Sequence, residues 1–137
     1  MSNNKDFIQP DRTRLLFVDD EKAFVEVIAK RLSKKGFDVT KAFSGTEALQ
    51  AIRKANYDIA VLDLKMAEMD GIEVLNILGK MAPELPVIIL SGHGSEAAAK
   101  EGIKCGAKDY LTKPCDFEEL VGIIKRVLLK DKAVGGG

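Results

Sequence analysis

Short apolar runs alternate along this chain with longer segments in which apolar residues recur at every third or fourth position. A short continuous apolar run is typical of a strand that is buried on both faces, and the longer period is typical of an amphipathic helix. Strands are therefore predicted at residues 15–18, 37–42, 58–63, 87–91 and 107–111. Helices are predicted at about residues 24–32, 48–55, 71–78, 96–104 and 117–128.

Five strands that alternate with five helices predict an α/β domain with a parallel sheet and right-handed crossovers. Ser44 and Glu47 form a capping box before the second helix. Asp70 and Asp116 are expected to cap the third and fifth helices. The fourth helix has only alanines and Ile103 to bury. It is therefore expected to be the least stable of the five helices and the one most suited to switching.

Polar side chains follow four of the predicted strands. Asp19 and Asp20 follow the first strand, Asp63 ends the third, Ser91 ends the fourth and Lys113 follows the fifth. Parallel strands direct their carboxyl ends to one edge of the sheet, where such sheets bind ligands. Alone, each residue would be read as a helix cap, a satisfied hydroxyl or a solvated charge. Together they predict three carboxylates, a hydroxyl and an ammonium group at one site.

These three carboxylates, the hydroxyl and the ammonium group together suit metal binding and phosphoryl transfer. Three neighbouring carboxylates raise one another's pKa values unless a cation lies among them. Oxygen ligands without His or Cys favour Mg²⁺ over a transition metal. A hard cation, a lysine and a hydroxyl around one carboxylate suit phosphoryl transfer to that carboxylate.

The composition limits the class of protein. At 137 residues, with 46% apolar and 31% charged residues, the chain is expected to form one globular domain. Basic and acidic residues balance at 21 each, which leaves no broad field for nucleic acid or an anionic membrane. Cys105 and Cys115 form no metal or disulfide motif, and no apolar stretch is long enough to span a bilayer. We expect a cytoplasmic domain that binds neither nucleic acid nor membrane directly.

The chain contains, in order, Leu-Phe-Val-Asp-Asp-Glu at residues 16–21, Leu-Asp-Leu-Lys-Met at 62–66, Met-Asp-Gly at 69–71, Ile-Leu-Ser-Gly at 89–92 and Gly-Ala-Lys-Asp-Tyr-Leu-Thr-Lys-Pro at 106–114. With these motifs, residues 14–130 resemble the receiver domain of two-component response regulators. The resemblance implies a single domain with a flavodoxin-like fold, a doubly wound parallel sheet of five βα units in strand order 2-1-3-4-5. Residues 1–13 and 131–137 are expected to be a flexible leader and a flexible tail.

The resemblance also implies a role for each residue of the cluster. Asp63 would accept a phosphoryl group from a phosphohistidine. Mg²⁺ would be bound by Asp63, directly by Asp20, largely through water by Asp19, and by the backbone carbonyl of Lys65. Lys113 would pair with the phosphoryl oxygens.

A second group of residues would form the switch. Ser91 would hydrogen-bond to the transferred phosphoryl group, and Tyr110 would turn inward when Ser91 moves. Alone, Tyr110 would be read as a core-edge aromatic. His93, together with Lys65, resembles the pair of variable positions that tune phosphoryl lifetime in the family; alone it would be a solvated loop residue. The peptide bond between Lys113 and Pro114 resembles the family's cis peptide.

The partners that the resemblance implies are a sensor histidine kinase or a histidine phosphotransfer protein, and a downstream effector or output domain. The target would dock on the face of the fourth helix, fifth strand and fifth helix, which the family also uses for homodimers. Such a chain acts in phosphorelay signal transduction as a phosphoacceptor that promotes its own phosphorylation and dephosphorylation, and not as an enzyme. Residues 91–95 resemble receivers attached to AAA+ transcription activators and hybrid kinases. The chain is either a stand-alone receiver or part of a longer regulator.

Two residues depart from the family pattern. Ala67 stands where the family usually has Pro, which frees the backbone φ and restores an N–H. The loop beside Asp63 is therefore expected to be more mobile, with an effect on the rate of phosphorylation more than on its occurrence. Gly92 replaces the commoner Ala, which keeps the phosphoryl site accessible and loosens the backbone.

Three other functions compete with the receiver interpretation. A Mg²⁺-dependent phosphatase of the haloacid dehalogenase type also forms an aspartyl phosphate, but it needs an Asp two residues after the nucleophile, where this chain has Lys65. A flavin site needs a Ser/Thr/Gly-rich phosphate loop after the first strand, where Asp19, Asp20 and Glu21 would repel phosphate. A phosphorylation-independent interaction module usually lacks part of the site, and none of the site residues is missing here.

Overall fold

The computed structural model describes residues 12–92 and 96–136, with no side chains described beyond residue 130. Its five strands are β2 (Arg14–Val18), β3 (Asp38–Ala42), β4 (Ile59–Leu62), β5 (Val87–Ser91) and β6 (Asp109–Thr112). All neighbouring strands pair in parallel, in the order β3-β2-β4-β5-β6. Counted along the chain from β2, this is the predicted order 2-1-3-4-5.

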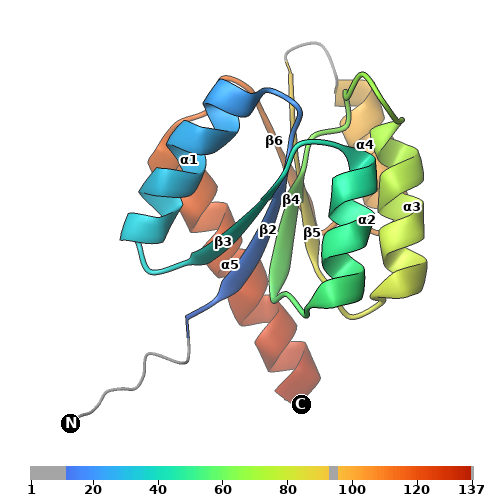
Figure 1. Ribbon diagram of the computed structural model, residues 1–137. Coiled ribbons are helices and arrows are strands. Elements are labelled where there is room, and N and C mark those ends of the chain that lie inside the picture. Colours follow the sequence, from blue (N-terminus) through green and yellow to red (C-terminus); the bar gives the residue numbers. More distant parts are fainter. Residues whose placement is uncertain (1–11, 93–95, 137) are drawn as a thin grey trace, which may run out of the picture.

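Helices cover both faces of the sheet (Figure 1). They are α1 (Lys22–Lys34), α2 (Gly45–Lys54), α3 (Gly71–Met81), α4 (Glu96–Lys104) and α5 (Phe117–Gly136). Helices α1 and α5 lie on one face, and α2, α3 and α4 lie on the other. The predicted doubly wound α/β fold is confirmed.

The central strand β4 shows why its sequence is continuously apolar. Ile59 and Val61 belong to the core under α1 and α5, whereas Ala60 and Leu62 belong to the core under α2 and α3. All four residues are fully buried. A strand that is covered on both faces has no solvent side on which to place polar residues, so its alternation disappears.

The capping residues predicted for the second and third helices act at the starts of α2 and α3. Ser44 Oγ accepts a hydrogen bond from Glu47 N at 3.1 Å, and Glu47 Oε1 accepts one from Phe43 N at 2.8 Å. Asp70 Oδ1 accepts from Ile72 N at 3.0 Å. These bonds satisfy backbone N–H groups that have no partner within the helix. The capping box before α2 and the cap of α3 are therefore confirmed.

The two ends of the predicted domain extend further than the sequence pattern indicates. Arg12, in the predicted leader, donates hydrogen bonds to the carbonyls of Gly36 at 3.1 Å and Phe37 at 2.7 Å. The rest of the leader, residues 1–11, lies outside the described residues. At the other end, α5 continues past residue 130 to Gly136. In the part of the chain that is described, no helix combines the length and the apolar character needed to cross a membrane.

Candidate functional site

The carboxyl ends of the strands place the predicted site residues at one edge of the sheet. The parallel ladder continues one residue past β2 and β4, because Asp19 N donates to the Ala42 carbonyl at 3.0 Å and Asp63 N donates to the Val18 carbonyl at 2.9 Å. Past β6, Lys113 N donates to the Ser91 carbonyl at 2.6 Å. The backbone of each of these residues is thus held by the sheet itself.

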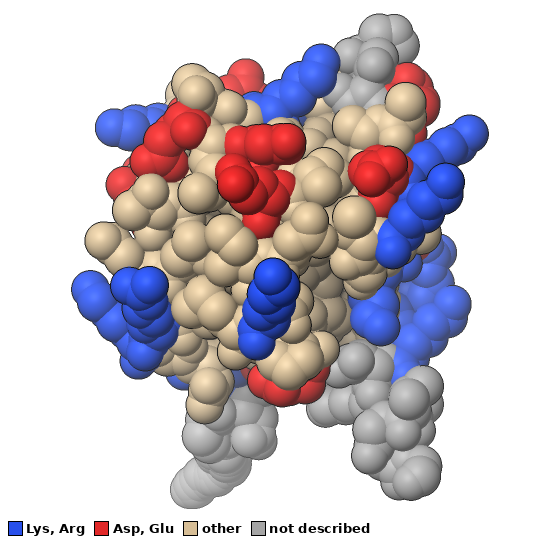
Figure 2. All heavy atoms as spheres, turned by 90° about the vertical axis from the view of Figure 1, so that its right-hand side faces the viewer, with Lys and Arg blue, Asp and Glu red and all other residues tan. Residues whose placement is uncertain are grey.

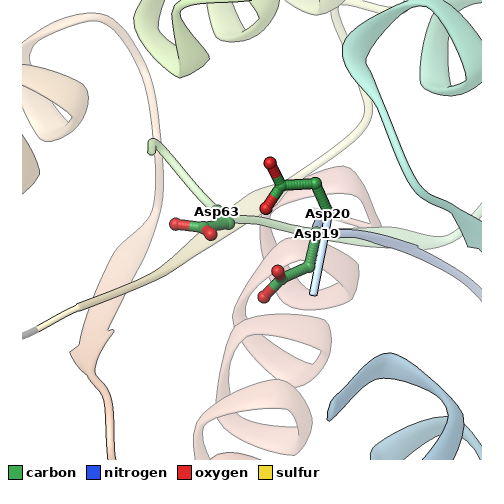
Figure 3. Close-up of side chains that lie close together, drawn as sticks. All are labelled: Asp19, Asp20 and Asp63. Atoms are coloured by element: carbon green, nitrogen blue, oxygen red, sulfur yellow. The ribbon is translucent and has the colours of Figure 1, made fainter. Parts of the chain in front are cut away.

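Three carboxylates converge at this edge. Figure 3 shows Asp19 and Asp20, which follow β2, lying beside Asp63, which follows β4. One oxygen of each side chain lies within 4.8 Å of the others. Asp19 and Asp63 are 0% and 4% exposed, and Asp20 is the most accessible of the three. Two buried carboxylates and a third at the surface form an oxygen-only cluster that opens toward solvent.

Lys113 offsets part of this negative charge. Its Nζ lies 2.6 Å from Asp19 Oδ2, 2.6 Å from Glu21 Oε1 and 3.5 Å from Asp63 Oδ2. It also lies 4.6 Å from the centre of the Phe24 ring. Burial by itself lowers the pKa of Lys113, but its contacts with Asp19 and Glu21 outweigh burial and raise that pKa above its ordinary value. The ammonium group is therefore charged at the centre of the site.

Asp19 is buried, which disfavours the charged form of its carboxylate. Burial raises its pKa above the ordinary value, against the opposing contacts with Lys113 and with the backbone N–H of Glu21. The buried Asp19 Oδ2 is paired with the Lys113 ammonium group at 2.6 Å. Asp20 and Asp63 bring two further carboxylates to the same site, so its negative charge exceeds that of one ammonium group, and the oxygen-only cluster fits a hard divalent cation such as Mg²⁺.

The two oxygens of Asp63 have different surroundings. Oδ1 accepts hydrogen bonds from Ser91 Oγ at 3.2 Å and from Lys65 N at 3.1 Å. Ser91 Oγ in turn accepts from Leu64 N at 3.2 Å, and Ser91 is 2% exposed. Oδ2 instead faces Lys113. One oxygen is thus restrained by two donors, whereas the other has the ammonium group as its partner among the described residues.

A cavity of about 620 Å³ opens over these groups. Its lining residues are Asp20, Glu21, Phe24, Asp63, Lys65, Gly92, Lys113 and Pro114. At Gly92 an added Cβ would meet no atom of the described residues within 4 Å, its chain neighbours apart. The Lys113–Pro114 peptide bond is cis, as the resemblance indicates. The cavity gives a phosphate-sized group access to Asp63.

Tyr110 lies beside the strand that carries Ser91. On β6 it pairs with Ile89 of β5, and its half-buried ring packs against the core on the α2–α4 face. The predicted switch residues Ser91 and Tyr110 are therefore on neighbouring strands. His93 lies outside the described residues.

Figure 2 shows the face of the molecule formed on the side of α2, α3 and α4. Acidic and basic side chains are interspersed on it, with acidic groups most frequent toward the end at which the strands terminate. Neither sign forms a continuous field on this face. Its mixed charge agrees with the overall balance of 21 basic and 21 acidic residues.

Two contacts of the site were not predicted. Glu21 forms an ion pair with Lys113, although it was considered only as a group that repels phosphate. Ala67 donates its backbone N–H to Asp20 Oδ2 at 2.9 Å. The position of Glu21 directly after the aspartate pair was a usable signal for the first contact. A backbone donor has no sequence signal, since every residue except proline carries one.

The loop between β4 and α3 is packed closely at Gly71. An added Cβ there would lie 2.3 Å from Leu64 Cα and 2.6 Å from the Leu64 carbonyl oxygen. The same carbonyl accepts a hydrogen bond from Gly71 N at 3.0 Å. Only a residue without a side chain fits at this approach of two backbone segments.

Gly71→Ala is expected to lower the free energy of unfolding by about 1–3 kcal/mol, because the methyl group would push α3 away from the loop. Gly79→Ala is the matched control in the same helix. Apart from its chain neighbours and the backbone of its own helix, no described atom lies within 4 Å of its added Cβ, so alanine should stabilise the helix by about 0.5–1 kcal/mol. Urea unfolding followed by circular dichroism measures both variants. A Gly71→Ala variant as stable as Gly79→Ala would contradict the close packing.

The sequence is similar to a known protein family and to several of its members. The sequence matches the response regulator receiver domain family over residues 15–125. It is 36% identical over 118 residues to the transcriptional regulatory protein ZraR of Escherichia coli K12, covering 86% of this chain and 27% of ZraR. It is 40% identical over 114 residues to a putative response regulator, NtrX-like, of Rickettsia felis, covering 82% of this chain and 24% of that protein.

A solved structure shares the fold. The receiver domain of NtrX from Brucella abortus superposes with a TM-score of 0.80 at 34% identity, covering 83% of this chain and 97% of that one. The match thus covers nearly the whole of that isolated receiver domain. By contrast, it spans about a quarter of the length of the curated relatives, at 27% of ZraR and 24% of the NtrX-like protein.

Proposed function

Because this chain belongs to the response regulator receiver domain family, we propose that it accepts a phosphoryl group on Asp63 in a Mg²⁺-dependent reaction. The donor is a phosphohistidine of a sensor histidine kinase or of a histidine phosphotransfer protein. The observation that carries the proposal is the asymmetry of Asp63. Its Oδ1 is held by Ser91 and Lys65, and its Oδ2 faces Lys113 at 3.5 Å.

Asp63 Oδ2 is the attacking atom in this proposal. An Oδ2–P bond forms as the N–P bond of the phosphohistidine breaks, and the bonding electrons return to the imidazole nitrogen. Lys113 offsets the negative charge that two anionic groups bring together in the transition state. The hydrogen bonds to Oδ1 fix the carboxylate so that Oδ2 stays directed at the cavity.

The residues that hold Mg²⁺ in the proposal are Asp19, Asp20, Asp63 and the Lys65 backbone carbonyl. When bound, this ion supplies positive charge that offsets the carboxylates and the incoming phosphoryl oxygens. The three carboxylates within 4.8 Å of one another, with Lys113 paired to two of them, support this assignment. Among the described residues, those that line the cavity include no His or Cys, and oxygen ligands of this kind favour Mg²⁺ over a transition metal.

Phosphorylation then shifts a conformational equilibrium. The transferred group offers new acceptor oxygens to Ser91 Oγ, which now contacts Asp63 Oδ1 and Leu64 N. Movement of Ser91 changes the space available to Tyr110 on the neighbouring strand. The free energy of this shift equals the difference between the interaction free energies of the phosphoryl group with the two conformations. We propose that an effector, an output domain or a second copy of the chain binds the surface of α4, β6 and α5, and that its affinity depends on which conformation is populated.

In this proposal the chain is a signalling phosphoacceptor that acts through whatever binds the surface of α4, β6 and α5. ZraR is named a transcriptional regulatory protein, and this chain covers only 27% of it. We propose that the domain controls an output of this regulatory kind. Phosphorylation that left the affinity for such an output unchanged would exclude the switch and leave the phosphoryl chemistry intact.

The first test uses intact-protein mass spectrometry after incubation with acetyl phosphate. With Mg²⁺ we expect one phosphoryl adduct for each chain, and with excess chelator we expect none, because the clustered carboxylates would repel the phosphodonor. A folded, Mg²⁺-saturated protein that forms no adduct would favour a phosphorylation-independent interaction module. An adduct that forms equally well in chelator would contradict the metal requirement.

A further inference from the structure

The backbone amide of Ala67 connects the loop after β4 to the end of β2. Ala67 N donates a hydrogen bond to Asp20 Oδ2 at 2.9 Å. The two residues are 47 positions apart in the sequence, so this bond joins two of the loops that form the acidic site. Proline at position 67 would have no N–H for this contact.

The loop is built so that this amide is held in place. Lys65 and Asp70 form an antiparallel bridge that closes the loop on both sides of Ala67. Next to Ala67, Glu68 Oε2 accepts a hydrogen bond from Thr46 Oγ1 at 2.9 Å, which ties the loop to the start of α2. The Ala67 N–H thus lies in a segment that is anchored before and after it.

Asp20 needs such a donor. Its carboxylate lies within 4.8 Å of the carboxylates of Asp19 and Asp63, and it repels both. Lys113 forms ion pairs with Asp19 and Asp63, but none with Asp20. Among the described residues, the Ala67 N–H is the one hydrogen-bond donor to the Asp20 carboxylate. No described residue donates a hydrogen bond to the other oxygen of the Asp20 carboxylate.

We propose that the Ala67 N–H is a positioning group for cation binding. It holds the Asp20 carboxylate by Oδ2 inside the acidic cluster before any cation arrives, and it leaves the second oxygen for Mg²⁺. This inference rests on the proposed function, whose metal requirement it deepens. Preorganisation of this kind raises affinity because less side-chain freedom is lost on binding.

Two substitutions separate the N–H from the flexibility of the loop. Ala67→Pro removes the donor and stiffens the backbone, whereas Ala67→Gly keeps the donor and loosens the backbone. If the hydrogen bond positions Asp20, only proline weakens Mg²⁺ binding. If loop rigidity were the deciding factor, the ranking would reverse, with glycine the weaker binder and proline equal to the unsubstituted protein or better.

Calorimetric titration of metal-free protein with Mg²⁺, without any phosphodonor, measures this ranking. We expect Ala67→Pro to raise the Kd by about fivefold to tenfold, the size of one charge-assisted hydrogen bond at an accessible site. Ala67→Gly should stay within about twofold of the unsubstituted protein, since its N–H is retained. Equal Kd values for the proline and glycine variants, or tighter binding by proline, would overturn the proposal.

Hydrogen exchange of the Ala67 amide tests the same point in the unsubstituted chain, so a proline variant that failed to fold would not leave the question open. We expect the amide to be protected both without Mg²⁺ and at saturating Mg²⁺. Loss of protection on Mg²⁺ binding would mean that the amide competes with the cation, which overturns the proposal. Neither measurement depends on phosphoryl transfer, so the outcome is distinguishable from failure of the acetyl phosphate experiment.

Discussion

Asp63→Asn is expected to abolish the phosphoryl adduct that acetyl phosphate and Mg²⁺ produce, while the protein stays folded. Asparagine has the same shape, and its amide oxygen can accept the hydrogen bonds that Ser91 Oγ and Lys65 N donate to Oδ1. Its amide nitrogen then takes the place of Oδ2, which faces Lys113. An amide nitrogen is neither charged nor nucleophilic, so the proposed attacking atom is lost while the packing is kept.

The matched control is Asp70→Asn, a second carboxylate of the same loop. Asp70 Oδ1 caps α3 by accepting from Ile72 N at 3.0 Å, and asparagine caps helices about as well as aspartate. This variant should form as much adduct as the unsubstituted protein when both are compared by intact mass. An adduct on Asp63→Asn would move the acceptor to another residue, and its position could then be found by mapping the labelled peptide.

The apolar runs predicted all five strands, but three of the predicted strands began too early. The third was predicted from Asp58 and begins at Ile59. The second was predicted from Phe37 and begins at Asp38, and the fifth was predicted from Ala107 and begins at Asp109. In both cases the N–H of the early residue is used by the preceding helix. Phe37 N donates to the Leu32 carbonyl, and Ala107 N donates to the Gly102 carbonyl.

These two residues each follow a glycine with positive φ, Gly36 at 102° and Gly106 at 114°. The glycine ends the helix, and the next residue completes the cap by donating its N–H to a carbonyl two residues before the last helical residue. An apolar residue directly after such a glycine therefore belongs to the helix cap, although its side chain resembles the start of a strand. This rule would have placed both strand starts more accurately.

The site residues were predictable because the sheet itself positions them. Residues at the ends of parallel strands share one edge, so Asp19, Asp63, Ser91 and Lys113 could be grouped without coordinates. What the pattern could not supply was the pairing within the group. Lys113 pairs with both Asp19 and Glu21, and the Ala67 amide pairs with Asp20. These pairings depend on the conformation of the loops, which the order of apolar and polar residues does not determine.

Lys113→Met is expected to lower the free energy of unfolding of the metal-free protein by about 3 kcal/mol. Lys113 is the cation that contacts the fully buried Asp19, and removing one partner of a buried pair leaves an uncompensated charge. Methionine retains an apolar contact with Phe24, so the loss reports mainly the missing charge. Lys113→Arg keeps the charge and is the control, with a smaller loss expected.

The effect of Lys113→Met should also depend on pH and on Mg²⁺, and this dependence distinguishes lost charge from lost packing. Burial raises the pKa of Asp19 above its ordinary value, so the folded state holds the proton more tightly than the unfolded state. Lowering the pH protonates Asp19 and removes the uncompensated charge, so the difference between variant and unsubstituted protein should shrink as the pH falls.

Added Mg²⁺ should stabilise the Lys113→Met variant more than the unsubstituted protein, because the cation no longer competes with an ammonium group beside Asp19 and Asp63. Urea unfolding of both proteins at two pH values, each with and without Mg²⁺, measures all of these differences. A loss of stability that is the same under every condition would mean that Lys113 acts through packing alone, and that the carboxylates do not need its charge.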